Sequence, residues 1–244
     1  MKVPTIIRSV YVSEIMRFID SPQVKIITGL RRSGKTEVLK MIWAEISKQI
    51  SQDHIIYINF EDMDFEEITD SKKLNAYFKT KMTDDSTYYI FLDEIQLIAD
   101  WEKSVNALRL KNTDIYITGS NSKLMSEELA TLLGGRTVSF RMNTLSFAEF
   151  MDFRTQCGIS TKNIDSELEQ YISIGGFPLL SVQSYSERDA QKIVTDINST
   201  ALLKDVAVRY KIRQPQLLDK LTAFLYDNVG NLISIRSIIQ YLKS

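Results

Sequence analysis

The sequence has very few of the residues that make covalent or metal-based cores. Cys157 is the only cysteine and His54 the only histidine among 244 residues. A disulfide within the chain is therefore excluded, and so is a histidine-rich metal cluster. A lone cysteine fits a reducing compartment. We expect both residues to be structural or on the surface, and the chemistry to lie elsewhere.

Long apolar runs and a net charge are also lacking. No stretch approaches the ~20 apolar residues that a membrane span needs, and the first residues lack the apolar centre of a signal peptide. The formal net charge is −1, so no overall field attracts nucleic acid or anionic lipid, and any DNA contact would have to be local. Apolar residues make up 44% and charged residues 25%, as in ordinary globular chains. We predict a folded, cytoplasmic protein with no membrane contact.

The first half of the chain alternates short β-branched runs with longer segments of helical period. Apolar residues at helical spacing, from Val38 to Ile50, predict a helix that packs one face on a sheet. Five runs are apolar enough for strands buried on both faces, at 24–28, 55–60, 88–93, 115–118 and 137–142. This order predicts an α/β fold with a parallel sheet, all of whose strands are interior.

The strand-like runs stop near residue 145, and helical periodicity takes over. In the tail, a helix from Gln214, a turn at Gly230 and Asn231, and a helix capped by Ser234 resemble the start of a winged helix. We therefore expect three parts, which are a core at 1–150, a helical lid at 151–212 and a partial winged-helix domain at 213–244.

The most informative segment is Gly29–Thr36, GLRRSGKT, which fits the phosphate-loop pattern G-x-x-x-x-G-K-[ST]. A chance match in a chain of this length has odds of about one in a hundred. Its glycines let the backbone approach phosphate, Lys35 is expected to reach the β- and γ-phosphates, and the Thr36 hydroxyl to bind Mg²⁺. We predict that ATP is bound by Gly29, Arg31, Arg32, Ser33, Gly34, Lys35, Thr36 and Glu37, with the two arginines at variable positions of the pattern.

A second motif follows the third predicted strand, where Tyr88–Asp93 is apolar and ends in two carboxylates, Asp93 and Glu94. Taken alone, such a pair is usually a solvated turn. Together with a phosphate loop upstream, it is typical of a Walker B motif. We predict that Asp93 holds Mg²⁺ and that Glu94 orients and deprotonates the attacking water.

Four further residues have two interpretations each. Ser120 and Asn121 follow the fourth strand, where they would polarise the water or cap the next helix. Arg136 and Arg141 lie at the start and end of the fifth strand. Either guanidinium would stabilise the transferred phosphoryl group, or would be an ordinary solvated arginine. We name Asn121 and Arg136 as catalytic candidates.

Gly175-Gly176-Phe177-Pro178 separates two helical segments. The plain interpretation is a turn that breaks a helix. The alternative is that Phe177 and Pro178 pack over the nucleotide from the lid.

With these motifs in order, the chain resembles bacterial and archaeal AAA-type ATPases of the STAND-related class, which carry a winged helix and a further C-terminal domain. The resemblance rests on IIRSVY, ITGLRRSGKT, YINFED, YYIFLDEIQ, IYITGSNS, LLGGR, LSFAEF and GGFP. It implies the sheet order 5-1-4-3-2 and a water-activating glutamate at Glu94. It also implies a GxP lid motif at Gly176 and Pro178, and an arginine, Arg8, that borders the adenine with Tyr11.

The chain departs from this family in two places. Gly119-Ser120 stands where some relatives have an arginine, so the γ-phosphate would be sensed differently. The sequence stops at Ser244, inside the second helix of the winged-helix unit, so we expect a truncated chain that lacks the recognition helix.

Three functions compete. The first is an ATP-controlled switch with slow Mg²⁺-dependent hydrolysis, whose lid moves a C-terminal region that contacts DNA or a protein, alone or as an oligomer. The second is a small-molecule kinase, against which the GGFP lid and a base beside Asp93 both count. The third is a DNA-binding module that nucleotide only stabilises.

Overall fold

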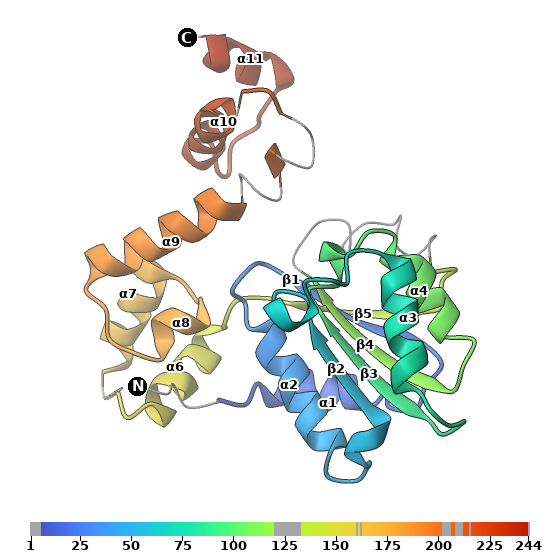
Figure 1. Ribbon diagram of the computed structural model, residues 1–244. Coiled ribbons are helices and arrows are strands. Elements are labelled where there is room, and N and C mark those ends of the chain that lie inside the picture. The colour runs from blue at the N-terminus through green and yellow to red at the C-terminus, as the bar shows by residue number, and fades with distance from the viewer. Residues whose placement is uncertain are drawn as a thin grey trace. The chain divides into compact units, whose positions relative to one another are not determined.

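The computed structural model describes residues 6–119, 133–159, 161, 163–201, 206–207, 212–214 and 216–243. The chain divides into two compact units, Met1–Ala190 and Gln191–Ser244 (Figure 1). The first contains the sheet and most of the helices predicted as a lid. The boundaries expected from the sequence, at 150 and 212, stay a prediction.

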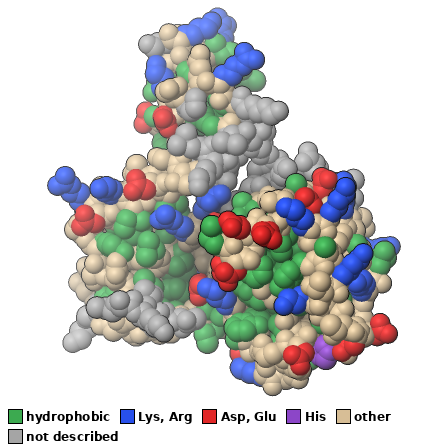
Figure 2. Space-filling model, in the orientation of Figure 1, with side chains coloured by type: hydrophobic (Ala, Val, Ile, Leu, Met, Phe, Trp, Pro, Cys, Tyr) green, Lys and Arg blue, Asp and Glu red, His purple; other side chains and the backbone are tan. Residues whose placement is uncertain are grey.

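The second unit contains a helix pair, α10 at Gln216–Asp227 and α11 at Ile235–Lys243. Gly230 turns the chain between them with φ of +85°, and the Ser234 hydroxyl accepts the Ser237 N–H at 3.1 Å. The predicted helix, turn and capped helix are thus confirmed, whereas the winged helix remains a prediction. At the surface of this second unit, hydrophobic side chains lie beside Lys and Arg side chains (Figure 2).

The first unit is built on a sheet of five parallel strands, in the order β2-β3-β4-β1-β5. This is the order that the resemblance implies, written from the other edge, so that expectation is confirmed. Because β1 lies between β4 and β5, the loop after β1 leaves the sheet beside the ends of both neighbours. The strands are β1 Val24–Gly29, β2 Ile55–Asn59, β3 Tyr88–Asp93, β4 Thr113–Gly119 and β5 Thr137–Met142.

The prediction that every strand is interior is wrong for the two edge strands. All residues of β1 and β3 are buried, whereas β2 alternates between buried and half-buried positions. On β5, Ser139 and Arg141 are exposed while Phe140 and Met142 are buried. An edge strand has one neighbour and is less covered, so a fairly apolar run does not by itself place a strand in the centre.

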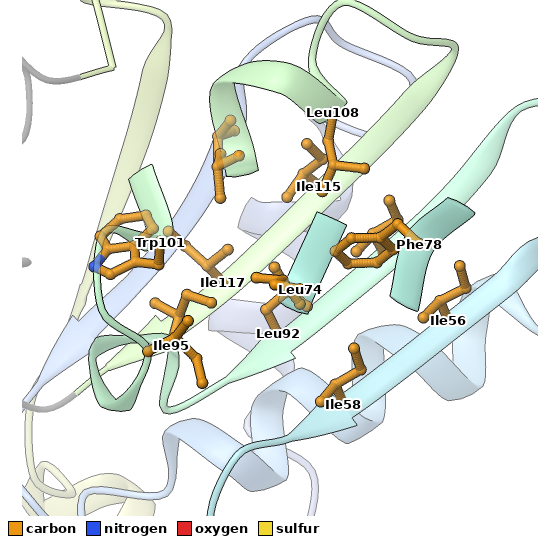
Figure 3. Packing of buried hydrophobic residues seen from close by; sticks show 14 of the residues in the cluster. Ile56, Ile58, Leu74, Phe78, Leu92, Ile95, Trp101, Leu108, Ile115 and Ile117 are labelled. Carbon is orange, nitrogen blue, oxygen red and sulfur yellow. The ribbon is translucent and has the colours of Figure 1, made fainter. Parts of the chain in front are cut away.

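Helices cover both faces of the sheet. One cluster joins α1 (Ser9–Met16) and α2 (Lys35–Ile46) to the sheet, and its buried helical side chains are Ile15, Val38, Leu39, Ile42 and Ile46. The other joins α3 (Ser71–Lys81) and α4 (Trp101–Leu108). Figure 3 shows Leu74, Phe78, Trp101 and Leu108 over the strand residues Ile115 and Ile117. Short turns lie at η1 Gln52–His54, η2 Met63–Phe65 and η3 Ile95–Leu97.

A buried ion pair holds the amino ends of β1 and β4. The Lys25 ammonium contacts the Asp114 carboxylate, and both side chains are almost wholly buried. Asp114 also accepts the Tyr116 hydroxyl and the Asp20 N–H, each at 2.9 Å. Burial lowers the pKa of Lys25, and the charge of Asp114 acts in the opposite direction. The polar network satisfies both charges at the edge of the sheet opposite the phosphate loop.

The remaining helices of the first unit follow β5. α6 (Phe147–Gln156) begins with a capping box formed by Ser146 and Glu149, and α7 (Ile164–Ile174) ends at Gly175. α8 (Pro178–Ser181) begins with Pro178, and α9 (Glu187–Ala201) crosses into the second unit. In the part of the chain that the structure describes, no helix is both long and apolar enough to cross a membrane.

Candidate nucleotide-binding site

The loop after β1 bends at positions that suit glycine. Gly29 has φ of +147°, and a β-carbon there would lie 2.2 Å from the carbonyl oxygen of Met142 on β5. Gly34 has φ of +95°, and Arg32 is also left-handed, with φ of +60°. α2 begins at Lys35, directly after the second glycine. The chain therefore passes from strand to helix through the tight turns that a phosphate-wrapping loop needs.

The start of α2 offers hydrogen-bond donors to an anion. Within the described part of the chain, no side chain caps this helix, and the first N–H groups of a helix have no partner within it. The hydroxyl of Ser33 is buried and has no hydrogen-bond partner among the residues that the structure describes. Phosphate oxygens would satisfy these groups, and the positive end of α2 favours their charge. The local structure therefore fits a nucleoside phosphate.

Lys35 lies inside this loop. Its residue is only 4% exposed, and its ammonium donates to the carbonyl oxygens of Leu30 at 3.0 Å and Gly29 at 3.3 Å. These bonds keep a buried cation at the loop, where phosphate needs one. Of the two loop arginines, Arg32 is exposed and Arg31 half-buried.

Asp93 ends β3 and is 1% exposed. Its carboxylate accepts the hydroxyl of Thr118 on β4 and, at 3.4 Å, that of Tyr57 on β2. Burial raises the pKa of Asp93, while hydrogen bonds from Thr118 and Thr36 act in the opposite direction. The predicted metal ligands Thr36 and Asp93 are thus brought together from α2 and β3.

This pair fits Mg²⁺. Among the residues that the structure describes, no group of three or more His, Cys, Asp or Glu side chains forms a metal cage. Magnesium usually takes only one or two carboxylates, together with phosphate oxygens and water. A buried carboxylate beside a hydroxyl, next to a phosphate loop, is a donor set of that kind.

Glu94 follows Asp93 in a left-handed conformation, with φ of +55° and ψ of +43°. Its N–H donates to the Thr118 hydroxyl at 3.1 Å, and its carboxylate accepts the amide of Gln96. A non-glycine residue in this region stores strain of about 1 kcal/mol or more. The two carboxylates have different partners, since Asp93 bonds Thr118 and Tyr57 whereas Glu94 bonds Gln96.

Thr118 is the site residue that the sequence interpretation missed. One hydroxyl bonds the Asp93 carboxylate and the Glu94 N–H, so it orders both residues. A usable signal was present, because the expected order places β4 beside β3 and both strands end at these residues. The sequence interpretation considered only the polar residues that follow β4 and missed the threonine within the strand.

Of the other catalytic candidates, Arg136 is not brought to the loop. Arg136 precedes β5, and its carbonyl accepts the N–H of Val24 at the start of β1. The length of a six-residue strand, about 20 Å, separates this end from the loop, so the Arg136 guanidinium does not serve the phosphate site of its own chain. Arg141 pairs with Thr28 at the loop end and is exposed. Ser120 and Asn121 lie outside the described residues.

A cavity of about 370 Å³ adjoins the loop. Gly34 lines one side, and Pro178 of α8 lines the other. The polar residues Arg8 and Glu37 reach it as well, and Glu37 is exposed and pairs with Lys40 of the next turn at 2.9 Å. The rest of the wall is apolar and consists of Ile6, Val38, Met41, Phe153, Leu179 and Val182. Size and lining are those of a small-ligand pocket with few polar groups.

Gly176 and Pro178 attach the α6–α8 helices beside this cavity. A β-carbon on Gly176 would lie 2.2 Å from the Leu145 carbonyl oxygen, and the Gly176 carbonyl accepts the Leu145 N–H at 2.6 Å. Tyr171 donates to the same Leu145 oxygen at 2.8 Å. Pro178 reaches within 3.9 Å of a β-carbon placed on Gly34. The GGFP turn thus lies beside the phosphate loop.

Arg8 also lines the cavity, but its guanidinium is engaged elsewhere. It donates to the carbonyl of Ser33 and to the carboxylate of Glu149, and its residue is 4% exposed. Tyr11 lies beneath it, with the ring centroid 4.5 Å from the guanidinium carbon. Arg8 is therefore at the site, held by protein groups.

Fold and site together define an AAA-type P-loop ATPase-like domain. Residues 21–151, more than half of the chain, match the family described as AAA domain, so the chain belongs to that family. Residues 165–243 match a domain of unknown function.

Two relatives cover almost the whole chain. An uncharacterized protein of Haemophilus influenzae is 36% identical over 240 residues, which is 97% of this chain and 59% of the relative. An uncharacterized protein of Methanocaldococcus jannaschii is 34% identical over 227 residues, 91% of this chain and 50% of the relative. The chain thus spans between half and three fifths of the length of these relatives.

Among solved structures, a Walker-type ATPase of Pyrococcus abyssi superposes with a TM-score of 0.55. The match covers 97% of this chain and 89% of that chain, at 14% identity. At this identity the likeness shows the fold alone.

Proposed function

We propose that this protein binds ATP with Mg²⁺, hydrolyses it slowly to ADP and phosphate, and uses the bound nucleotide to set the position of its lid, the helices α6–α8. One observation carries the proposal. The phosphate loop opens onto an apolar cavity that Gly34 of the loop and Pro178 of the lid both line. A flat apolar base with a charged phosphate tail suits such a combination.

The binding roles follow from position. The N–H groups at the start of α2 and the Lys35 ammonium would hold the β- and γ-phosphate oxygens. The Thr36 hydroxyl and the Asp93 carboxylate would hold Mg²⁺, which neutralises phosphate charge when bound. The apolar cavity wall would enclose the base.

Hydrolysis is assigned to Glu94. Its carboxylate would orient a water and accept its proton as the water oxygen bonds to the terminal phosphorus. The bond from that phosphorus to the bridging oxygen breaks, and ADP leaves with the electron pair. Thr118 supports the step by holding the Glu94 N–H and the Asp93 carboxylate.

The output of the switch would lie in the C-terminal region. Three apolar side chains there are widely exposed, namely Val229, Leu232 and Ile235. Exposed apolar groups in one short segment favour contact with another surface. We propose that the lid controls this contact, made with a protein or DNA partner.

The binding assignment is tested by calorimetry with ATP and Mg²⁺. Lys35→Ala is expected to weaken binding by about tenfold or more, because a charge-assisted contact to phosphate is lost. Lys48→Ala, just beyond the far end of the same helix, is the control, since its exposed pair with Glu45 lies away from the loop. Undiminished binding by Lys35→Ala contradicts the assignment.

The hydrolysis assignment is tested by phosphate release. Glu94→Gln keeps the size of the side chain and is expected to retain ATP binding while lowering turnover by roughly 10²–10⁴-fold. Turnover at the native rate would remove Glu94 as the base. Free phosphate without an added acceptor distinguishes the ATPase from a kinase, and a melting temperature raised by ATP without turnover would favour a nucleotide-stabilised binding module.

A further inference from the structure

Arg8 makes four hydrogen bonds to three separate parts of the first unit. Its Nε donates to Glu149 Oε1 at 2.9 Å and its Nη2 to Glu149 Oε2 at 3.0 Å. Its Nη1 donates to the carbonyl oxygens of Ser33 at 3.2 Å and Asn143 at 2.9 Å. An arginine has five N–H donors, so one remains. Arg8 is therefore bound to the protein rather than available to read a base.

Glu149 connects Arg8 to the lid, because it lies in the first turn of α6. The same carboxylate that receives Arg8 in two-pronged fashion accepts the Ser146 N–H at 2.9 Å and completes the capping box of α6. A bidentate arginine–carboxylate pair fixes orientation as well as distance. The first turn of α6 is therefore set by the plane of the Arg8 guanidinium.

The two hydrogen bonds of Arg8 Nη1 connect the side chain to the core. Ser33 lies in the phosphate loop, directly before Gly34 and Lys35, so its carbonyl belongs to the segment that would surround phosphate. Asn143 is the first residue after β5, and its N–H donates to the Tyr11 hydroxyl at 3.3 Å. One planar group thus joins the phosphate loop, the exit from the sheet and the first lid helix.

We infer that Arg8 is a positioning residue that couples the phosphate loop to lid helix α6 through Glu149. This inference rests on the proposed binding of nucleotide at the loop. A planar guanidinium cannot follow the Ser33 carbonyl without turning its two bonds to Glu149. Nucleotide that orders the loop therefore orders the start of α6. Arg8 acts through these partners, and the base lies against the apolar cavity wall.

The test uses hydrogen exchange of the α6 amides with and without ATP and Mg²⁺, and calorimetry of ATP binding, on the full chain. Arg8→Lys keeps the charge and loses the two-pronged geometry. Glu149→Gln keeps a capping side chain at the same position and loses the ion pair. Arg17→Lys, an exposed arginine that follows α1, is the matched control.

In wild-type protein and Arg17→Lys, ATP is expected to slow exchange in α6. In Arg8→Lys and Glu149→Gln this slowing should shrink by about tenfold or more while ATP still binds, and the double variant should be no worse than either single one. A merely structural role would lower the melting temperature and leave the ATP-dependent slowing intact, which would overturn the inference.

Failure of the proposed function gives a different pattern. If calorimetry shows no ATP binding to the wild-type protein, the proposed function is contradicted. The connection between the loop and α6 is then tested without ligand. Arg8→Lys and Glu149→Gln should each speed hydrogen exchange of the α6 amides by about tenfold relative to the amides of the sheet. Equal exchange in α6 would overturn the link as well. Should Arg8→Lys fail to fold, Glu149→Gln supplies the same comparison.

Discussion

Replacing Gly176 by alanine probes the attachment of the lid at one atom. A β-carbon at this position would lie 2.2 Å from the Leu145 carbonyl oxygen, and that obstacle is backbone. Relief of the overlap needs a displacement of about 1 Å, because non-bonded contacts become favourable only near 3.5 Å. The Leu145 N–H bond to Gly176, now 2.6 Å long, would break, and the Tyr171 bond to Leu145 would be strained.

Each hydrogen bond contributes about 0.5–1.5 kcal/mol net, so the lid anchor should weaken by roughly 1–3 kcal/mol. If the lid forms one wall of the nucleotide pocket, affinity for ATP should fall by about 5- to 100-fold, since 1.4 kcal/mol is a factor of ten. Calorimetry measures this affinity, and thermal unfolding measures stability. Pro178 would move away from Gly34 with the lid.

Gly134→Ala is the control. Gly134 has φ of +62°, and apart from its two chain neighbours no atom of the described residues lies within 4 Å of the place that an added β-carbon would take, so alanine there introduces strain of about 1–2 kcal/mol without a clash from them. It lies next to the start of β5, at the edge away from the phosphate loop. It should reduce stability and leave ATP affinity unchanged. Native ATP affinity in Gly176→Ala, or an equal loss in Gly134→Ala, would refute the reasoning.

Two further substitutions test the sheet, one beside the site and one at its opposite edge. Thr118→Val keeps the shape of the side chain but leaves the Asp93 carboxylate and the Glu94 N–H without their shared partner. Unfolding experiments should show a loss of stability of about 1–3 kcal/mol, and phosphate release should be slower. Unchanged turnover would contradict the ordering role of Thr118. Lys25→Met strands the buried charge of Asp114 and should cost about 3–5 kcal/mol, measured by denaturant unfolding. Lys103→Met breaks an exposed pair and should cost far less stability, so similar losses in both variants would refute the burial argument.

Much of the core was predictable because local patterns and tertiary structure agree there. The glycines of Gly29–Thr36 need left-handed turns, which no other residue supplies as readily, and the structure has them at Gly29 and Gly34. Asp93 ends an apolar run and lies at the carboxyl edge, because parallel strands bring their ends to the same side. Which strands form the edges was not visible, since edge and centre strands differ in coverage more than in composition.

The arginines show the limits of sequence interpretation most clearly. A guanidinium is equally suited to phosphate, carboxylate or water, so its type does not reveal its partner. Arg136 was a catalytic candidate, yet it lies at the far end of β5. Arg8 was expected beside the base, and it lines the candidate cavity, but the sequence did not reveal that its guanidinium bonds Glu149, 141 residues further along the chain.

By itself, the sequence determined the phosphate loop, the carboxylate pair after β3 and the parallel α/β core, because each depends on residue types at short, fixed spacing. Only the tertiary structure decided that Thr118 serves both Asp93 and Glu94, and that Arg8 joins the loop to α6. These contacts link segments far apart in the chain. Their partners are chosen by strand order and helix packing, which no local pattern records.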